Sequence, residues 1–197
     1  MSTTNLKALN RRSVVARLLR DRGDALVVTS LGNPTFDVSA AGDTPLNFYL
    51  WGAMGGAAMV GLGMAIAQPE RRVVVIVGDG EQMMALGSLA TIACEKQANL
   101  ILVVLNNEHY AETGMQPAHA GRGVDLPGIA KAAGFKDVSS VDTDEELEVL
   151  AQRLFSSAGP LFTSIKISTD PNPVSLPPRD GPYLRSRFRE AVLGSAT

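Results

Sequence analysis

Two uninterrupted runs of apolar residues constrain the fold of this chain more than any other feature. Residues 73–77 (VVVIV) and 100–105 (LILVVL) contain no polar position. Strands of this kind are typical of parallel sheets that helices cover on both faces. A polar segment follows each run directly: residues 78–80 (GDG) and residues 106–107 (NN), with 25 residues between them. The acid and the amides are therefore predicted to meet at the carboxyl edge of the sheet, where open α/β sheets bind ligands.

The rest of the chain alternates apolar runs with amphipathic segments, which predicts a doubly wound, mostly parallel α/β fold with helices on both faces. The remaining strands are expected at residues 25–29, 136–141 and 160–167, and loops at residues 30–34 and 106–124. Helices are expected from Leu6 to Leu19 and at residues 53–67, 83–94, 126–133, 143–157 and 185–192. We expect residues 1–197 to form a single domain with a proline-rich extension from about residue 170.

Composition narrows the class of protein. The net charge is −2 and no basic stripe is present, which argues against nucleic acid as a partner. Cys94 is the only cysteine, so an intrachain disulfide and a Cys-ligated iron–sulfur cluster are both excluded. The first residues have no apolar core of a signal peptide, and the glycine-rich residues 52–67 are too short to span a bilayer comfortably. We therefore expect a cytoplasmic protein without membrane contact.

The residues after the two apolar strands have the chemistry of a metal–phosphate site. A carboxylate, amide oxygens and glycine-freed backbone suit a hard cation such as Mg²⁺ that also holds a phosphate. An Asp-Gly pair alone usually marks a turn. GDG after one hydrophobic strand and NN after the next is more specific, and this pattern resembles the signature of thiamine-diphosphate (ThDP) enzymes.

That resemblance implies a set of cofactor ligands. The carboxylate of Asp79, the side-chain oxygen of Asn107 and the backbone carbonyl of His109 would bind Mg²⁺. Backbone around Gly78, Gly80 and Glu81 would approach the diphosphate. The alternative for Glu81 is an acid that favours the start of its own helix.

Residues 51–55 (WGAMG) are similar to a second cofactor segment of the same enzymes. The resemblance implies that the carbonyl of Gly52 accepts a hydrogen bond from the 4′-amino group of the cofactor. It also implies that Met54, which follows Ala53, wedges between the two cofactor rings. The alternative for Met54 is ordinary core packing.

Two loops are expected to complete the site. Ser30 and Gly32 follow the strand at residues 25–29 and could bind phosphate oxygens; a turn with Ser/Thr capping is the alternative. His109 and Tyr110 begin a long polar loop beside the cofactor segment. The ring of His109 is a candidate for substrate contact and catalysis, together with Gly52 and Met54; the alternative is that only its carbonyl takes part.

The resemblance extends beyond the cofactor motifs. Residues 31–35 (LGNPT), 47–49 (NFY), 113–116 (TGMQ) and 178–181 (PRDG) occur in order. Together they resemble the β subunits of sulfopyruvate decarboxylase and phosphonopyruvate-decarboxylase-like enzymes. The resemblance implies ThDP- and Mg²⁺-dependent decarboxylation of a small 2-oxoacid. It also implies an α subunit that carries a pyrimidine-binding domain and its glutamate, with the active site at the interface.

Other functions stay open from the residues alone. A paralogue that binds ThDP or a partner without turnover would keep the same motifs. A 2-oxoacid oxidoreductase β subunit is less favoured, because the single cysteine cannot ligate a cluster. A nucleotide-binding oxidoreductase ranks last, since no GxGxxG opens a helix after the first strand.

Overall fold

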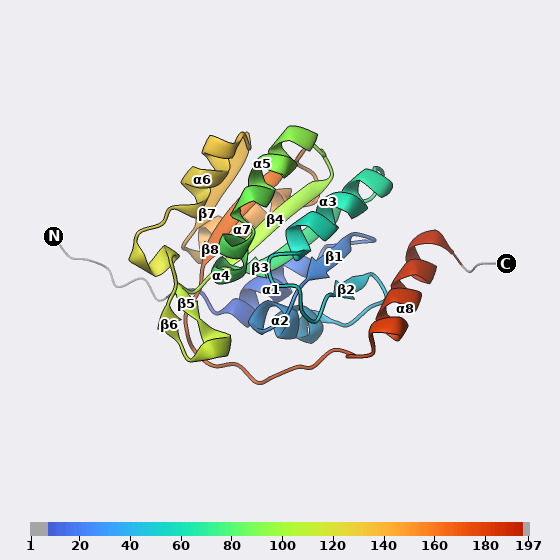
Figure 1. Ribbon diagram of the computed structural model, residues 1–197, viewed down its shortest axis with the longest axis horizontal. Coiled ribbons are helices and arrows are strands. Elements are labelled where there is room, and N and C mark those ends of the chain that lie inside the picture. Colours follow the sequence, from blue (N-terminus) through green and yellow to red (C-terminus); the bar gives the residue numbers. More distant parts are fainter. Residues whose placement is uncertain (1–7, 195–197) are drawn as a thin grey trace.

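A six-stranded parallel sheet forms the centre of the computed structural model, which describes residues 8–194 (Figure 1). The strands lie in the order β2-β1-β3-β4-β8-β7, and every neighbouring pair is parallel. A second, two-stranded sheet, β5-β6, is antiparallel. The predicted α/β class is therefore confirmed.

The elements follow one another along the chain as strand–helix units. Their bounds are α1 (Arg11–Leu19), β1 (Leu26–Thr29), α2 (Asn33–Ala41), β2 (Asn47–Tyr49), α3 (Ala57–Ala67), β3 (Val73–Gly78), α4 (Asp79–Met84), α5 (Leu86–Glu95), β4 (Leu100–Asn106), β5 (His109–Tyr110), η1 (Ala111–Thr113), β6 (Gln116–Pro117), η2 (Ala120–Arg122), α6 (Leu126–Ala133), β7 (Asp137–Val141), α7 (Asp144–Arg153), β8 (Leu161–Lys166) and α8 (Gly181–Leu193).

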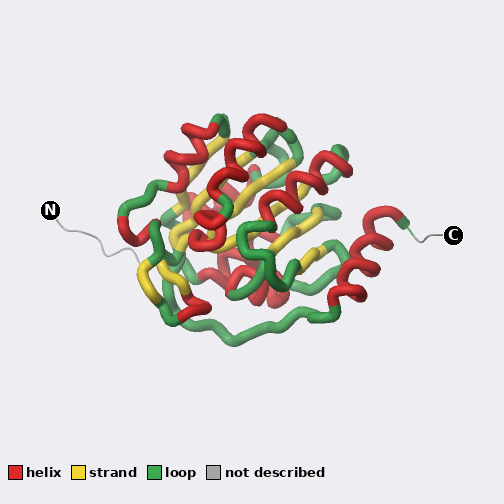
Figure 2. Tube along the Cα trace, viewed as in Figure 1, coloured by secondary structure: helices red, strands yellow, loops and turns green. Residues whose placement is uncertain are grey.

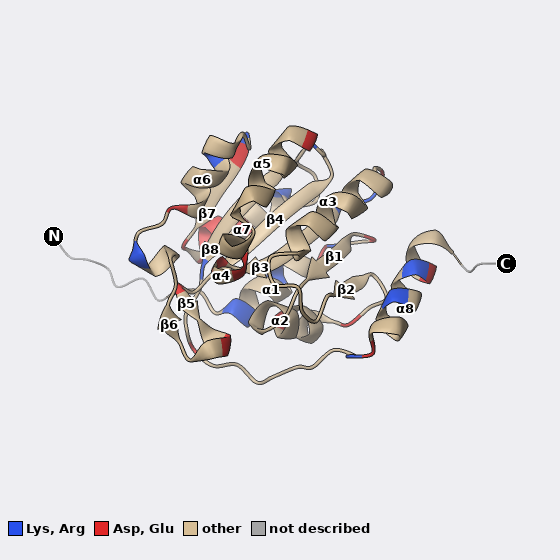
Figure 3. Ribbon diagram, in the orientation of Figure 1, with Lys and Arg blue, Asp and Glu red and all other residues tan. Residues whose placement is uncertain are grey.

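The core lies in two layers, one on each face of the sheet. Val74 and Ile76 of β3 pack with residues of α1, α2 and α7, whereas Val73 and Val75 pack with residues of α3, α5 and α6. This alternation is what the period of two in a strand requires when both faces are covered. The central strands β3 and β4 carry no charged residue along their length (Figure 3).

The order of the strands places a crevice at one point of the sheet edge. From β1 the chain moves outward to β2, then returns to the other side of β1 and continues through β3 and β4. The carboxyl ends of β1 and β3 therefore flank the point where the strand order reverses, which is where such sheets bind ligands. Gly78 of β3 pairs with Leu105 of β4, so the two strands end level with each other.

Helix α2 and strand β2 were not predicted from the sequence. Helix α2 turns polar residues toward the core, because Thr35 and Asp37 are both fully buried. Thr35 shares a hydrogen bond of 3.0 Å with Thr29, and Asp37 pairs with arginines of α1. Because buried polar residues with internal partners occupy core positions of α2, the helix lacks the apolar stripe by which an amphipathic helix is recognised in a sequence. Strand β2 is only three residues long, which is too short to give a clear pattern.

Other boundaries differ from the prediction where the backbone turns. The helix predicted at residues 53–67 begins only at Ala57, and the one predicted at residues 83–94 is two helices that meet at Ala85. The predicted loop at residues 106–124 contains β5 and β6. Helix α8 begins at Gly181, capped by the side chain of Asp180. Leu6, at the start of the first predicted helix, lies outside the described residues.

Within residues 8–194, no helix is both long enough and apolar enough to cross a membrane.

The contact between α3 and β3 gives a direct test of the packing. A Cβ atom added at Gly61 would overlap the side chain of Val75, whereas one added at Gly63 would meet nothing within 4 Å. We expect Gly61→Ala to lower the free energy of unfolding by about 1–3 kcal/mol, because overpacking forces the layers apart. The matched control Gly63→Ala should raise it by up to about 1 kcal/mol, because alanine favours the helix. Urea unfolding measures both, and equal effects of the two variants would contradict the packing.

Candidate functional site

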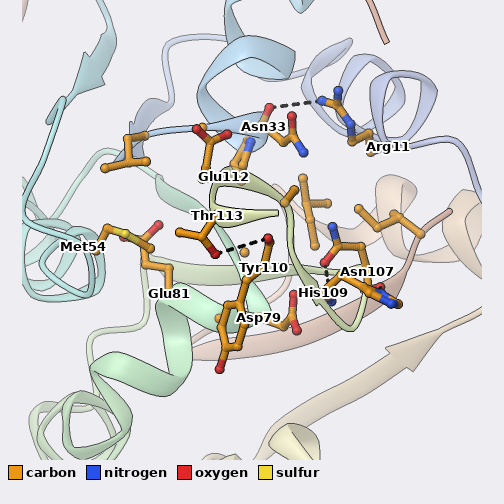
Figure 4. Close-up of a pocket in the computed structure, with 18 residues that line it drawn as sticks. Arg11, Asn33, Met54, Asp79, Glu81, Asn107, His109, Tyr110, Glu112 and Thr113 are labelled. Atoms are coloured by element: carbon orange, nitrogen blue, oxygen red, sulfur yellow. Dashed lines mark hydrogen bonds between the residues drawn. The ribbon is translucent and has the colours of Figure 1, made fainter. Parts of the chain in front are cut away.

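A cavity opens at the carboxyl edge of the sheet, at the point where the strand order reverses. Its empty volume is about 680 Å³, a figure that includes the solvent-open space at its mouth. The loops after β1, β3 and β4 line it, and Arg11 and Met54 contribute from elsewhere in the chain (Figure 4). The lining residues are Arg11, Leu31, Gly32, Asn33, Pro34, Met54, Gly78, Asp79, Gly80, Glu81, Leu105, Asn107, His109, Tyr110, Ala111, Glu112, Thr113 and Ile167.

Most of the predicted site residues are therefore brought together. Ser30, Gly52 and Ala53 do not line the cavity. Ser30 is fully buried behind it and donates a hydrogen bond of 3.0 Å from its hydroxyl to the carbonyl of Gly52. A phosphate contact by the Ser30 hydroxyl stays a prediction.

Asp79 is a buried carboxylate with one oxygen left without a partner. It is the first residue of α4 and is 2% exposed. Burial raises the pKa of Asp79 to about 6, while hydrogen bonds from the backbone N–H groups of Asp79, Asn107 and Gly80 oppose that rise. The oxygen Oδ2 has no hydrogen-bond partner. Such an atom is costly to bury, and a bound cation would compensate it.

Asn107 and His109 form a tight local turn at the other side of the cavity. The side-chain oxygen of Asn107 accepts a hydrogen bond of 2.9 Å from the backbone N–H of His109. The ring nitrogen Nδ1 of His109 lies 2.8 Å from the backbone carbonyl of Asn107. These two bonds hold the amide oxygen of Asn107 within the turn that follows β4, and the nearby backbone of Asn107 lowers the pKa of the Asp79 carboxyl.

Glu81 is a second buried acid and does more than begin a helix. It is 5% exposed, and its Oε1 accepts a hydrogen bond of 3.3 Å from the backbone N–H of Gly55. Burial raises the pKa of Glu81 to about 7, although the backbone N–H of Gly55 and the nearby hydroxyl of Ser30 oppose that rise. The side chain thus ties α4 to the turn at residues 51–55.

That turn carries unusual backbone conformations. Trp51 and Ala53 have φ of 51° and 49°, and Gly52 and Gly55 have φ of 148° and 87°. Residues with side chains rarely adopt such values, and they gather at functional sites. Met54 is 41% exposed and lines the cavity, so it is not a core residue.

The segment after β4 folds over the cavity. A Cβ atom at Gly80 would come within 2.6 Å of the ring of Tyr110, and one at Gly32 would come within 2.8 Å of the carboxylate of Glu112. The hydroxyl of Tyr110 lies 2.6 Å from Nδ1 of His119. Both glycines are thus needed for the close approach of this segment.

Arg11 is a cavity residue that sequence reasoning missed. It is 5% exposed and donates to Asp37 and, over 3.3 Å, to the carbonyl of Asn33. Arg12 binds the same carboxylate of Asp37, so two guanidinium groups share one buried acid. The sequence signal was the pair of adjacent arginines at the start of an amphipathic helix, which is usually read as solvated surface.

Within the described part of the chain, no group of three or more His, Cys, Asp or Glu side chains could hold a metal ion. A metal at this edge would therefore depend on one carboxylate, an amide oxygen, backbone carbonyls and oxygens of a bound ligand. Mg²⁺ bound through one or two carboxylates and substrate phosphates has this ligand set.

Comparison with known proteins agrees with this geometry. Residues 32–165 match the family model described as "Thiamine pyrophosphate enzyme, C-terminal TPP binding domain". The chain belongs to this thiamine pyrophosphate enzyme family. The matched region runs from Gly32 to Ile165 and so contains every lining residue except Arg11, Leu31 and Ile167.

The chain is also similar to individual members of the thiamine pyrophosphate family. It is 34% identical over 187 residues to the sulfopyruvate decarboxylase subunit beta of Methanothermobacter thermautotrophicus, covering 95% of this chain and 97% of that one. It is 37% identical over 164 residues to the phosphonopyruvate decarboxylase of Streptomyces viridochromogenes, covering 83% of this chain but only 40% of that one. The crystal structure of benzoylformate decarboxylase from Polynucleobacter necessarius shares the fold, with a TM-score of 0.68 and 21% identity over 84% of this chain and 34% of that one.

The cavity fits the Mg²⁺–diphosphate end of the family's cofactor. Asp79 lines the cavity, and its buried oxygen Oδ2 has no hydrogen-bond partner, so a cation bound there would satisfy it. Added Cβ atoms at Gly78 and Gly52 would meet nothing within 4 Å, so the backbone there is open to a close ligand.

Because Asp79 is buried and one of its oxygens has no partner, its ionisation should destabilise the unliganded chain. The pKa of Asp79 rises from 3.8 to about 6 on folding, so this cost appears as the pH rises above about 4 and is complete above about 6. We expect Asp79→Asn to raise the free energy of unfolding without cofactor by about 1–3 kcal/mol at pH 8, and to have little effect near pH 4. Urea unfolding at the two pH values measures this.

Asp170 is exposed, and only its backbone takes part in hydrogen bonds among the described residues, so Asp170→Asn is the matched control. A loss of stability in Asp79→Asn at pH 8 would show that the carboxylate has a structural partner.

Proposed function

We propose that this chain is the diphosphate- and Mg²⁺-binding subunit of a ThDP-dependent 2-oxoacid decarboxylase. The observation that carries the proposal is the buried, unpartnered Oδ2 of Asp79 at the reversal point of the strand order. Membership of the thiamine pyrophosphate family and similarity to named decarboxylases support the same assignment.

The proposed ligands of Mg²⁺ are the carboxylate of Asp79, the side-chain oxygen of Asn107 and the backbone carbonyl of His109. Diphosphate oxygens would complete the coordination, consistent with the small number of protein ligands. The backbone of Gly32, Gly78, Gly80 and the residues beside them would contact the diphosphate. Arg11 and Arg12 share the carboxylate of Asp37, so these three groups carry one net positive charge, and the carboxylate of Glu112 lies nearby against Gly32.

The other end of the cavity is proposed to hold the reactive part of the cofactor. In Figure 4, Met54 and Glu81 lie on the opposite side of the cavity from Arg11 and Asn107. Met54 would hold the two rings of the cofactor in a bent arrangement, and the carbonyl of Gly52 would orient the amino group. When bound, ThDP supplies the carbanion chemistry by which a 2-oxoacid loses CO₂, and the protein positions it.

We further propose that the active site is completed by a separate subunit with a pyrimidine-binding domain. Residues 8–194 contain one large sheet, and this chain covers nearly the whole of a relative named as a subunit beta but less than half of the phosphonopyruvate decarboxylase. The chain as a whole would then be one cofactor-binding domain with an extension from about residue 170. Two exposed methionines are candidates for contact with that partner: Met54, which lines the cavity, and Met84.

Calorimetry on the full chain tests cofactor binding. We expect ThDP to bind in the presence of Mg²⁺ and to lose measurable affinity after EDTA treatment. Asp79→Ala should abolish Mg²⁺-dependent binding, because the metal loses its only carboxylate ligand, whereas Asp170→Ala should bind as the unaltered chain does. Unchanged affinity in Asp79→Ala would show that the site is misplaced.

Turnover separates a decarboxylase subunit from a paralogue that binds ThDP without catalysis. We expect release of CO₂ from a small 2-oxoacid such as sulfopyruvate only after addition of a pyrimidine-domain partner. Little or no activity is expected from the chain alone. Rapid turnover by the purified chain would contradict the two-subunit site, and no turnover with any such partner would favour the non-catalytic paralogue.

A further inference from the structure

The turn at residues 51–55 needs an external restraint to hold its shape. Trp51 and Ala53 both adopt left-handed backbone conformations that side chains disfavour. The turn is not stabilised by regular secondary structure, because α3 begins only at Ala57. Its conformation therefore depends on contacts that neighbouring segments make with it.

Besides a ring contact with Phe36, with the centroids 6.5 Å apart, Trp51 makes three contacts with polar or charged groups. Its backbone N–H donates to the carbonyl of Ser30 over 3.0 Å. Its indole Nε1–H donates to the carbonyl of Pro178 over 2.7 Å. The guanidinium of Arg179 lies over its ring, 5.5 Å from the centroid. Two of the three contacts thus come from the far C-terminal part of the chain.

We name residues 168–180 the C-terminal strap. It is the long loop that leaves the sheet after β8 and runs along the edge of the molecule to α8 (Figure 2). It lies beyond the end of the family-model match at residue 165. Prolines at positions 171, 173, 177 and 178 restrict its backbone to extended conformations.

The strap is anchored at both ends and along its length. Arg12 donates to the carbonyl of Pro173 over 2.7 Å, and the hydroxyls of Ser39 and Ser175 lie 3.2 Å apart. Past its end, helix α8 is held to β2: the rings of Phe48 and Phe188 are 5.2 Å apart, and Arg187 makes two hydrogen bonds with Asp43. These contacts on both sides of Pro178 hold its carbonyl in place against the indole of Trp51.

We infer that the C-terminal strap positions the cofactor-binding turn, with Pro178 and Arg179 holding Trp51 so that Gly52 and Met54 face the cofactor. This inference rests on the proposed function of the cavity. Pro178, Arg179 and Trp51 are positioning residues, because none of them lines the cavity. A change in the length or the anchoring of the strap would therefore change the affinity of the chain for the cofactor.

Trp51→Phe removes the indole N–H and keeps an aromatic ring. We expect this variant to bind ThDP with Mg²⁺ about three- to tenfold more weakly in calorimetry on the full chain, since one hydrogen bond is lost. Arg179→Gln should weaken binding about two- to fivefold, the range of an exposed cation–ring contact. Arg179→Lys, which keeps the cation, should recover most of that loss. The matched control Arg185→Gln, an exposed residue on α8, should bind as the unaltered chain does.

If the strap had a purely structural role, these variants would have a lower melting temperature but unchanged ThDP affinity below the melting transition. That result would overturn the inference.

Trp51 is the only tryptophan, so its fluorescence reports directly on its contact with the C-terminal strap. We expect Arg179→Gln to increase acrylamide quenching of Trp51 and Mg²⁺–ThDP to decrease it. Unaltered chain that binds no ThDP would overturn the proposed function as well, whereas equal affinity of all variants would overturn the inference alone.

Discussion

Parallel pairing of β3 with β4 is the interaction on which the rest of the site depends. Because Gly78 and Leu105 lie opposite each other, the residues that follow them leave the sheet at the same level. Asp79 and Asn107 therefore line the same cavity, and the backbone of Asn107 is near enough to lower the pKa of the Asp79 carboxyl. The apolar character of both strands, which secures this register, also excludes water from the acid beside them. The same packing thus places the site and creates the unsatisfied charge that a metal would compensate.

This arrangement lowers the stability of the folded protein when no ligand is bound. Burial raises the pKa of both Asp79 and Glu81, so each acid is harder to ionise in the folded chain than in water. Glu81 has partners in the turn at residues 51–55, whereas one oxygen of Asp79 has none. The turn itself holds two residues in left-handed conformations. Sites with such strain are commonly supported by contacts from elsewhere in the fold, and here Pro178 and Arg179 of the strap supply two of them.

Sequence patterns predicted the parts of the structure that apolar periodicity encodes. Hydrophobic runs predicted five of the strands, namely β1, β3, β4, β7 and β8. The polar residues just after two of these runs predicted that Asp79 and Asn107 lie at the same edge of the sheet. Helix α2 could not be found, because Asp37 and Thr35 occupy core positions whose partners are distant in sequence. Arg11 was missed as a cavity residue for the same reason. The contact between the strap and Trp51 joins residues far apart in the chain, so no local sequence pattern predicts it.

The most direct test of the account is the position of the metal in a crystal of the chain grown with ThDP and Mn²⁺ in place of Mg²⁺. Anomalous scattering locates Mn²⁺ independently of the refined coordinates. We expect a single peak at the carboxyl edge of the sheet, where Mn²⁺ is bonded to Oδ2 of Asp79 and to the side-chain oxygen of Asn107, with diphosphate oxygens beside it. Diphosphate density in the cavity with Mn²⁺ bound elsewhere, or with Asp79 still unpartnered, would contradict it.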